Sequence, residues 1–146
     1  MTDTELIAEL SLPAYAGKTA SERVAMLNAP KEGVTFPVIV PKGVVFAILA
    51  RVPQRISGLS AGAQAECTQM LENIRSLDQG LYTWLPDGHP LQANTAYGFD
   101  RAIELGAMTA EEKTLLETFG RRTGSRAEEL WGEGFVISLN DVAKVT

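Results

Sequence analysis

The sequence has a single cysteine, Cys67, and a single histidine, His89. One cysteine excludes an internal disulfide and a zinc site built from several cysteines. A general base needs a partner that orients it, and a metal site needs further ligands at fixed spacing. The turn at residues 86–90 offers His89 neither. We therefore expect Cys67 to be a buried small hydrophobe on a helix and His89 to be an exposed turn residue.

Long apolar runs and a basic start are also missing. No run approaches the ~20 residues that cross a bilayer, and the first residues, MTDTELIAEL, are acidic where a secretory signal is basic. With 18 acidic and 13 basic residues, the formal net charge of −5 gives no attraction to a nucleic-acid backbone. We expect a protein of the cytoplasm that binds neither membranes nor specific nucleic-acid sequences.

Sequence motifs of catalysis are absent too. The chain has no Gly-x-Ser-x-Gly nucleophile elbow and no glycine-rich phosphate loop after a strand. The glutamate pairs Glu111-Glu112 and Glu128-Glu129 lie in the first turn of predicted helices, where the helix dipole favours negative charge without any catalytic role. We expect no enzymatic activity, no catalytic residues, no cofactor and no metal.

The residues that are present predict a mainly α fold. Hydrophobic residues make up 45% and charged residues 21%, as in an ordinary globular domain. Apolar residues at helical spacing predict helices over residues 3–10, 61–77 and 91–105. The apolar run at residues 44–51 is too short for periodicity to decide, but its Ala and Leu content favours a buried helix. Capping boxes begin further helices at Thr19, Thr109 and Ser125, and a last turn begins at Asn140 or Asp141. We expect a small helical bundle with short extended or β arms, forming a single domain over residues 1–146.

Two segments are candidates for contacts with other chains. Residues 33–41 are rich in β-formers, but Pro37 lacks the amide hydrogen of a central strand, so we expect an extended arm or an edge strand. The tail over residues 132–146 follows Trp131 and contains a strand-like run after two glycines. Side chains of both segments fit a protein interface or the core of the chain itself. The interface candidates are Phe36, Val38, Val40, Trp131, Phe135, Val136 and Ile137.

Short segments near the two ends carry a resemblance to known proteins. They are Tyr15-Ala16-Gly17, Thr19, the helix end at Leu27-Asn28, and Ser125-Arg126-Ala127-Glu128-Glu129-Leu130 with its following glycine, short β run and last helix. With these segments the chain resembles small helical morphogenesis or virion proteins of long-tailed, siphovirus-like bacteriophages. The resemblance does not extend over residues 34–91.

The resemblance implies a non-enzymatic structural protein of the head-tail connector (adaptor), neck or tail-completion type. Such a chain would form a homo-oligomeric ring and contact other phage structural proteins, such as portal or tail proteins. It would lie in the host cytoplasm during assembly and then in the virion, at the head-tail junction or tail. Two alternatives stay open: a small cytoplasmic phage protein that binds and inhibits or redirects a host factor, and an enzyme that uses dispersed residues.

Overall fold

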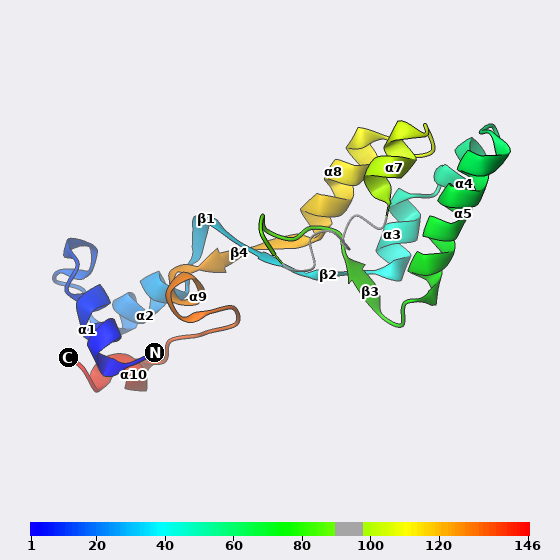
Figure 1. Cartoon of the computed structure of the whole chain (residues 1–146). Coiled ribbons are helices and arrows are strands. Elements are labelled where there is room, and N and C mark those ends of the chain that lie inside the picture. The colour runs from blue at the N-terminus through cyan, green and yellow to red at the C-terminus, as the bar shows by residue number, and fades with distance from the viewer. Residues whose placement is uncertain (90–97) are drawn as a thin grey trace. The chain divides into compact units, whose positions relative to one another are not determined.

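The computed structural model describes residues 1–89 and 98–146, and in them the chain divides into two compact units. Unit 1 contains both ends of the chain, Met1–Thr35 and Thr123–Thr146, and unit 2 contains Phe36–Arg122 (Figure 1). Helix predominates, as the sequence predicts, and the helices are accompanied by two small sheets. The helices are divided between two cores, where the sequence led us to expect one bundle in one domain.

Unit 1 is built from short helices at the two ends of the chain. These are α1 (Asp3–Leu10), the 3-10 helix η1 (Pro13–Tyr15), α2 (Ala20–Asn28), α9 (Arg126–Trp131) and α10 (Leu139–Ala143). Their core consists of Leu6, Leu10, Tyr15, Leu27, Ala127, Ile137 and Val142. Since the first four of these precede residue 30 and the last three follow residue 125, neither end of the chain makes this core alone.

Unit 2 holds the larger core. Its helices are α3 (Lys42–Ile48), α4 (Val52–Ile56), α5 (Ala61–Ser76), α7 (Phe99–Glu104) and α8 (Ala110–Phe119), and its strands are β2 (Ile39–Pro41) and β3 (Gly80–Tyr82). The predicted stripe of α5 is confirmed, because Ala63, Cys67, Met70, Leu71 and Ile74 are all buried. Phe99 and Leu116 close the same core from α7 and α8.

The two sheets have two strands each. Strands β2 and β3 are antiparallel, with Ile39 opposite Tyr82 and Val40 opposite Leu81. Strand β1 (Pro30–Pro37) pairs with β4 (Arg121–Ser125). Both β1 and β4 contain a boundary between the units, so the chain passes from one unit to the other through this sheet. Residues 33–41 are extended, as predicted, and their strands β1 and β2 are paired inside the chain.

Helix starts agree closely with the sequence prediction. The capping boxes at Thr19, Thr109 and Ser125 are present with both reciprocal hydrogen bonds, and Thr2 makes another. The last helix begins differently from the expectation. Its N-cap is Ser138, and Asp141 is the residue whose side chain returns to the cap, so the predicted caps at Asn140 or Asp141 were wrong.

Three further differences concern short segments. Phe135–Ile137 is not a strand, because its backbone has a side chain as its partner in place of a second strand. Strand β4 was not expected, since its polar sequence, RRTGS, lacks the alternation of a half-buried strand. Of the helix expected over residues 91–105, residues 91–97 lie outside the described part, and α7 ends at Glu104.

Candidate functional site

The predicted interface residues of the 33–41 segment lie in unit 2. Val40 is 1% exposed and belongs to the core. Phe36 is half-buried, and the guanidinium of Arg122 lies over its ring at 5.2 Å from the centroid. Val38 is also half-buried, and its backbone N–H donates to the carbonyl of Gly120. The contacts recorded for these residues are thus made within unit 2.

The predicted interface residues of the C-terminal segment lie in unit 1 and face different ways. Ile137 is 1% exposed and belongs to the core. Trp131 and Phe135 pack against that core and against each other, with ring centroids 5.5 Å apart. Val136 is 70% exposed. The structure therefore brings Trp131, Phe135 and Ile137 together, while Val136 faces the solvent.

A buried ion pair, which the sequence did not predict, joins the two ends of the chain in unit 1. Both carboxylate oxygens of Glu9 accept from Arg126, from Nε and Nη2, each at 2.8 Å. The hydroxyl of Tyr15 donates to the same carboxylate at 3.0 Å. The side chain of Glu9 is only 7% exposed and that of Arg126 is 28% exposed. This two-pronged geometry is the strong form of an Arg–carboxylate pair.

The ion pair changes the acidity of its members. Hydrogen bonds from Arg126 hold the pKa of Glu9 below its usual value, against the opposing effect of burial. Burial, together with the bond to Glu9, raises the pKa of Tyr15 to about 12. Glu9 is therefore a carboxylate and Tyr15 a neutral phenol at neutral pH. Both are held in the states that make their mutual hydrogen bond.

One signal in the sequence pointed to this pair. Glu9 is three residues after Leu6 and next to Leu10, on the buried side of the predicted helix. A charged residue in such a place is rarely buried without a partner. The sequence could not identify the partner, because Arg126 is 117 positions away along the chain.

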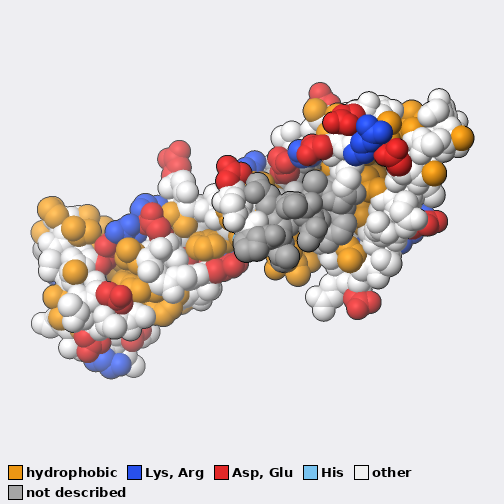
Figure 2. All heavy atoms as spheres, in the orientation of Figure 1, with side chains coloured by type: hydrophobic (Ala, Val, Ile, Leu, Met, Phe, Trp, Pro, Cys, Tyr) orange, Lys and Arg blue, Asp and Glu red, His pale blue; other side chains and the backbone are white. Residues whose placement is uncertain are grey.

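Helices α1 and α9 enclose a groove beside the ion pair, with a volume of about 450 Å³. We call it the α1/α9 groove, and its lining consists of Glu5, Ala8, Glu9, Leu12, Arg126, Leu130 and Trp131. Leu12 and Leu130 are exposed apolar side chains, while the guanidinium of Arg126 is held by Glu9 and Glu129. On the face of unit 1 that Figure 2 shows, hydrophobic side chains lie among charged ones. A groove with apolar residues at its rim and with its charged groups paired to each other is suited to contact with the surface of another protein.

A second hollow, of about 560 Å³, shares Glu9, Leu12 and Arg126 with the groove. Its other walls come from η1, the end of α2 and the start of β1, and they include Tyr15, Met26 and Pro30. Lys31 in this wall is paired with Glu129 at 2.6 Å. The ion pair Glu9–Arg126 and Leu12 therefore line both hollows of unit 1.

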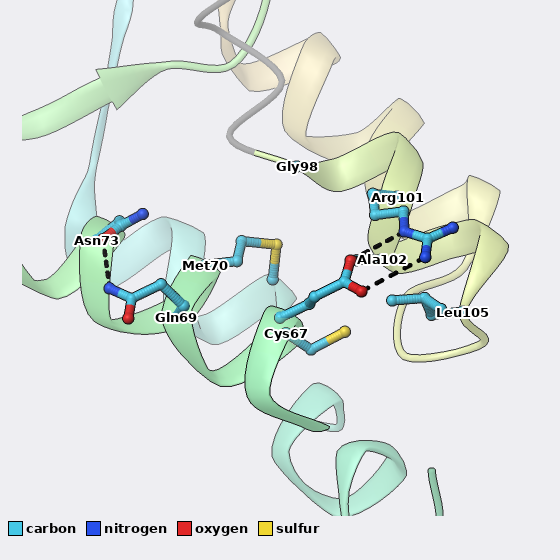
Figure 3. Close-up of a pocket in the computed structure, with 9 residues that line it drawn as sticks. Cys67, Gln69, Met70, Asn73, Gly98, Arg101, Ala102 and Leu105 are labelled. Atoms are coloured by element: carbon cyan, nitrogen blue, oxygen red, sulfur yellow. Dashed lines mark hydrogen bonds and ion pairs between the residues drawn. The ribbon is translucent and has the colours of Figure 1, made fainter. Parts of the chain in front are cut away.

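Unit 2 has a hollow of its own, of about 350 Å³, between α5 and α7 (Figure 3). Cys67 and Met70 lie at its base, and burial raises the pKa of the Cys67 thiol. Arg101 at its edge is bound to Glu66 at 2.9 Å and to Glu104 at 3.1 Å. The charged groups of the lining are thus paired with each other, Gln69 donates to Asn73 at 2.9 Å, and the thiol is buried.

The remaining expectations concern metals, histidine and membranes. In residues 1–89 and 98–146, no group of three or more His, Cys, Asp or Glu side chains is placed to hold a metal ion. His89 is half-buried at the end of a turn in which its N–H donates to the carbonyl of Pro86. No helix in the same part of the chain is long and apolar enough to span a bilayer.

Comparison of the chain with protein-family models, with curated proteins and with solved structures gives no match. The site must therefore be interpreted from its own chemistry. Its apolar rim and internally neutralised charges are features of surfaces that bind other proteins.

Proposed function

We propose that this protein is a non-enzymatic structural protein of a long-tailed bacteriophage, of the head-tail connector, neck or tail-completion type. It acts by packing against copies of itself and against other phage structural proteins, such as portal or tail proteins. Its place is the host cytoplasm during assembly and then the virion.

The observation that carries this proposal is the position of the segments that resemble phage proteins. Tyr15 and Leu27 come from the first resembling segment and Ala127 from the second, and all three belong to the core of unit 1. Neither segment can bury its apolar face alone. The two resembling segments lie at opposite ends of the chain but contribute to the core of one compact unit.

The α1/α9 groove supplies the contact surface that the proposal needs. Leu12 and Leu130 expose apolar surface at its rim, and exposed apolar patches with a polar surround mark sites of protein association. Trp131, one of the interface candidates, lines the groove. Aromatic side chains are enriched among interface anchors.

The proposal is tested by measuring self-association and presence in particles. We expect light scattering to show a homo-oligomer and mass spectrometry of purified virions to find the chain. Leu12→Asp and Leu130→Asp should reduce oligomerisation, because each places a charge on the rim. Leu115→Asp is the matched control, since Leu115 is similarly exposed but lies on α8 in unit 2.

Two results would count against the proposal. A strict monomer that is absent from virions would contradict it. A stoichiometric complex with a host protein, again without copies in particles, would favour a phage protein that binds and inhibits or redirects a host factor. The neighbouring genes give an independent indication, because portal, capsid and tail-tube genes favour a virion role and early genes favour the host-factor role.

A further inference from the structure

Unit 1 carries most of the net charge of the chain. It contains nine acidic and five basic side chains, whereas unit 2 contains nine acidic and eight basic ones. Of the formal net charge of −5, unit 1 therefore holds −4 and unit 2 holds −1. A charge of this sign attracts basic partners and repels acidic ones, a second copy of unit 1 included.

The cations that line the two hollows of unit 1 are already paired. Arg126 lines both hollows and is bound to Glu9 and to Glu129. Lys31 lines the second hollow and is bound at 2.6 Å to Oε2 of Glu129, the oxygen that Arg126 also contacts. One carboxylate thus serves two cations, and an incoming anion would have to displace it.

Two carboxylates that line the hollows make no ion pair in the described part of the chain. Glu5 lines the α1/α9 groove and accepts the N–H of Thr2 at 2.7 Å, which leaves its negative charge in place. Glu32 lines the second hollow from β1 and is exposed. Each hollow therefore offers one negative charge that no cation of residues 1–89 and 98–146 compensates.

The walls beside these carboxylates are apolar. Leu12 lines both hollows and is exposed, as are Leu130 in the α1/α9 groove and Met26 in the second hollow. With volumes of about 450 and 560 Å³, both hollows are in the size range of ligand sites. A ligand that matches both features combines apolar side chains with positive charge.

We propose that the two hollows bind a basic, apolar segment of a different protein. Its apolar side chains lie against Leu12, Met26 and Leu130, and its lysine or arginine side chains face Glu5 and Glu32. Exposed pairs of this kind add a modest attraction each, and an acidic segment at the same place is repelled. The inference rests on the proposed function, which makes the α1/α9 groove a protein contact, and it specifies the chemistry of the partner.

Short peptides test this preference with the full chain. The probes are acetylated five-residue peptide amides in which leucine, at both ends and in the middle, alternates with lysine, glutamine or glutamate. Binding is followed by NMR titration of the isotope-labelled chain at low salt. We expect the lysine peptide to bind roughly tenfold more tightly than the glutamate peptide, with shifts at Leu12, Met26 and Leu130. The difference should shrink in about 0.3 M NaCl, since salt screens exposed charges.

Three results of the titration would overturn the inference. They are equal binding of the lysine and glutamate peptides, shifts confined to residues outside the two hollows, and no binding of any peptide.

Charge-neutral variants of the chain make the test sharper. Glu32→Gln and Glu5→Gln should each weaken binding of the lysine peptide roughly threefold and leave binding of the glutamine peptide unchanged. Glutamine in place of Glu5 can still return to the N-cap of α1, so the helix start is preserved. Glu72→Gln is the matched control, because Glu72 is exposed on α5 of unit 2 and makes no ion pair with a described residue. If Glu72→Gln weakened binding as much as the other two variants, net charge alone would be responsible and the site would be refuted.

The outcomes separate this inference from the proposed function. If no peptide binds and Leu12→Asp abolishes self-association, the hollows are an interface between copies, so the proposed function stands and the inference falls. If the lysine peptide binds as expected and the chain is absent from virions, the inference stands and the proposed function falls.

Discussion

At the scale of single residues, the pair Glu9–Arg126 shows how unit 1 accommodates a buried charge. A buried carboxylate loses its hydration and must recover that free energy from partners. Glu9 does so with two hydrogen bonds from Arg126 and one from Tyr15. The same bonds connect α1 with α9, so a local need for charge compensation determines how the two chain ends meet.

Removal of the guanidinium should destabilise unit 1. We expect Arg126→Met to cost about 3 kcal/mol in the free energy of unfolding, because Glu9 is left buried with only Tyr15 as partner. Chemical denaturation measures the change, followed by Trp131 fluorescence in a Trp84→Phe background for unit 1 and by Trp84 fluorescence in a Trp131→Phe background for the control in unit 2. The control is Arg101→Met, whose ion pair with Glu66 is about half exposed and is worth less than about 1 kcal/mol. The double variant Glu9→Met with Arg126→Met should recover much of the loss, and equal costs for Arg126→Met and Arg101→Met would contradict our account.

The same pair predicts how stability depends on pH. Because the pKa of Glu9 is lower in the folded protein than its usual value of 4.5, ionised Glu9 favours the folded state. Its contribution is fully present above pH 4.5 and is lost as the pH falls through the lowered pKa. The free energy of unfolding of Glu9→Gln, measured by chemical denaturation, should therefore fall less steeply below pH 4.5 than that of the natural protein. If the free energy of unfolding fell equally steeply in both proteins over that range, Glu9 would not be responsible for the loss of stability in acid.

At the scale of secondary-structure elements, caps and turns explain where helices begin. Ser125 and Glu128 show this well. Glu128 returns to the N–H of Ser125 and also binds the N–H of Gly134, so one carboxylate starts α9 and fixes the turn after it. In the pair Glu128-Glu129, Glu128 thus has a defined structural role.

The approach of β2 to β3 depends on the absence of a side chain at Gly80. A Cβ at this position would lie 2.2 Å from the carbonyl oxygen of Val40, which is backbone and has little freedom to move. We expect Gly80→Ala to disrupt the β2–β3 pairing and to increase amide hydrogen exchange at Ile39, Val40 and residues 80–82. Gly43→Ala is the matched control in α3, where nothing lies within 4 Å of the new Cβ, and should be neutral or stabilising by up to about 1 kcal/mol. Similar exchange in the two variants would refute the steric explanation.

At the scale of the whole molecule, the chain has two cores instead of one. Each contains residues that are almost completely buried, such as Leu27 in unit 1 and Leu116 in unit 2. Each unit also has one of the two tryptophans, Trp131 in unit 1 and Trp84 in unit 2. The unfolding of the two cores can therefore be followed separately.

We expect a cavity in one core to lower the stability of that unit first. Leu27→Ala, measured in a Trp84→Phe background, should lower the stability reported by Trp131 by about 2–5 kcal/mol. The same substitution in a Trp131→Phe background should leave the transition reported by Trp84 unchanged. Leu116→Ala should give the reverse pattern. If either substitution shifted both transitions by the same amount, the two cores would be a single cooperative unit.

Features that depend on near neighbours in the chain could be read from the amino-acid sequence. The helix face of residues 61–77, the capping boxes at Thr19, Thr109 and Ser125 and the burial of Cys67 follow from helical spacing and from hydrogen bonds over three or four residues, so they could be predicted. The face of residues 3–10 was predicted only in part, because Leu6 and Leu10 are buried but Ile7 is exposed and Glu9 takes its place. Which faces pack together is seen only once the chain is folded. The fold places Glu9 with Arg126 and Asn28 with Ile137, gives β1 the polar strand β4 as a partner, and divides the apolar residues between two cores. These pairings join residues that are far apart in the chain, and periodicity shows that a face is buried without showing what buries it.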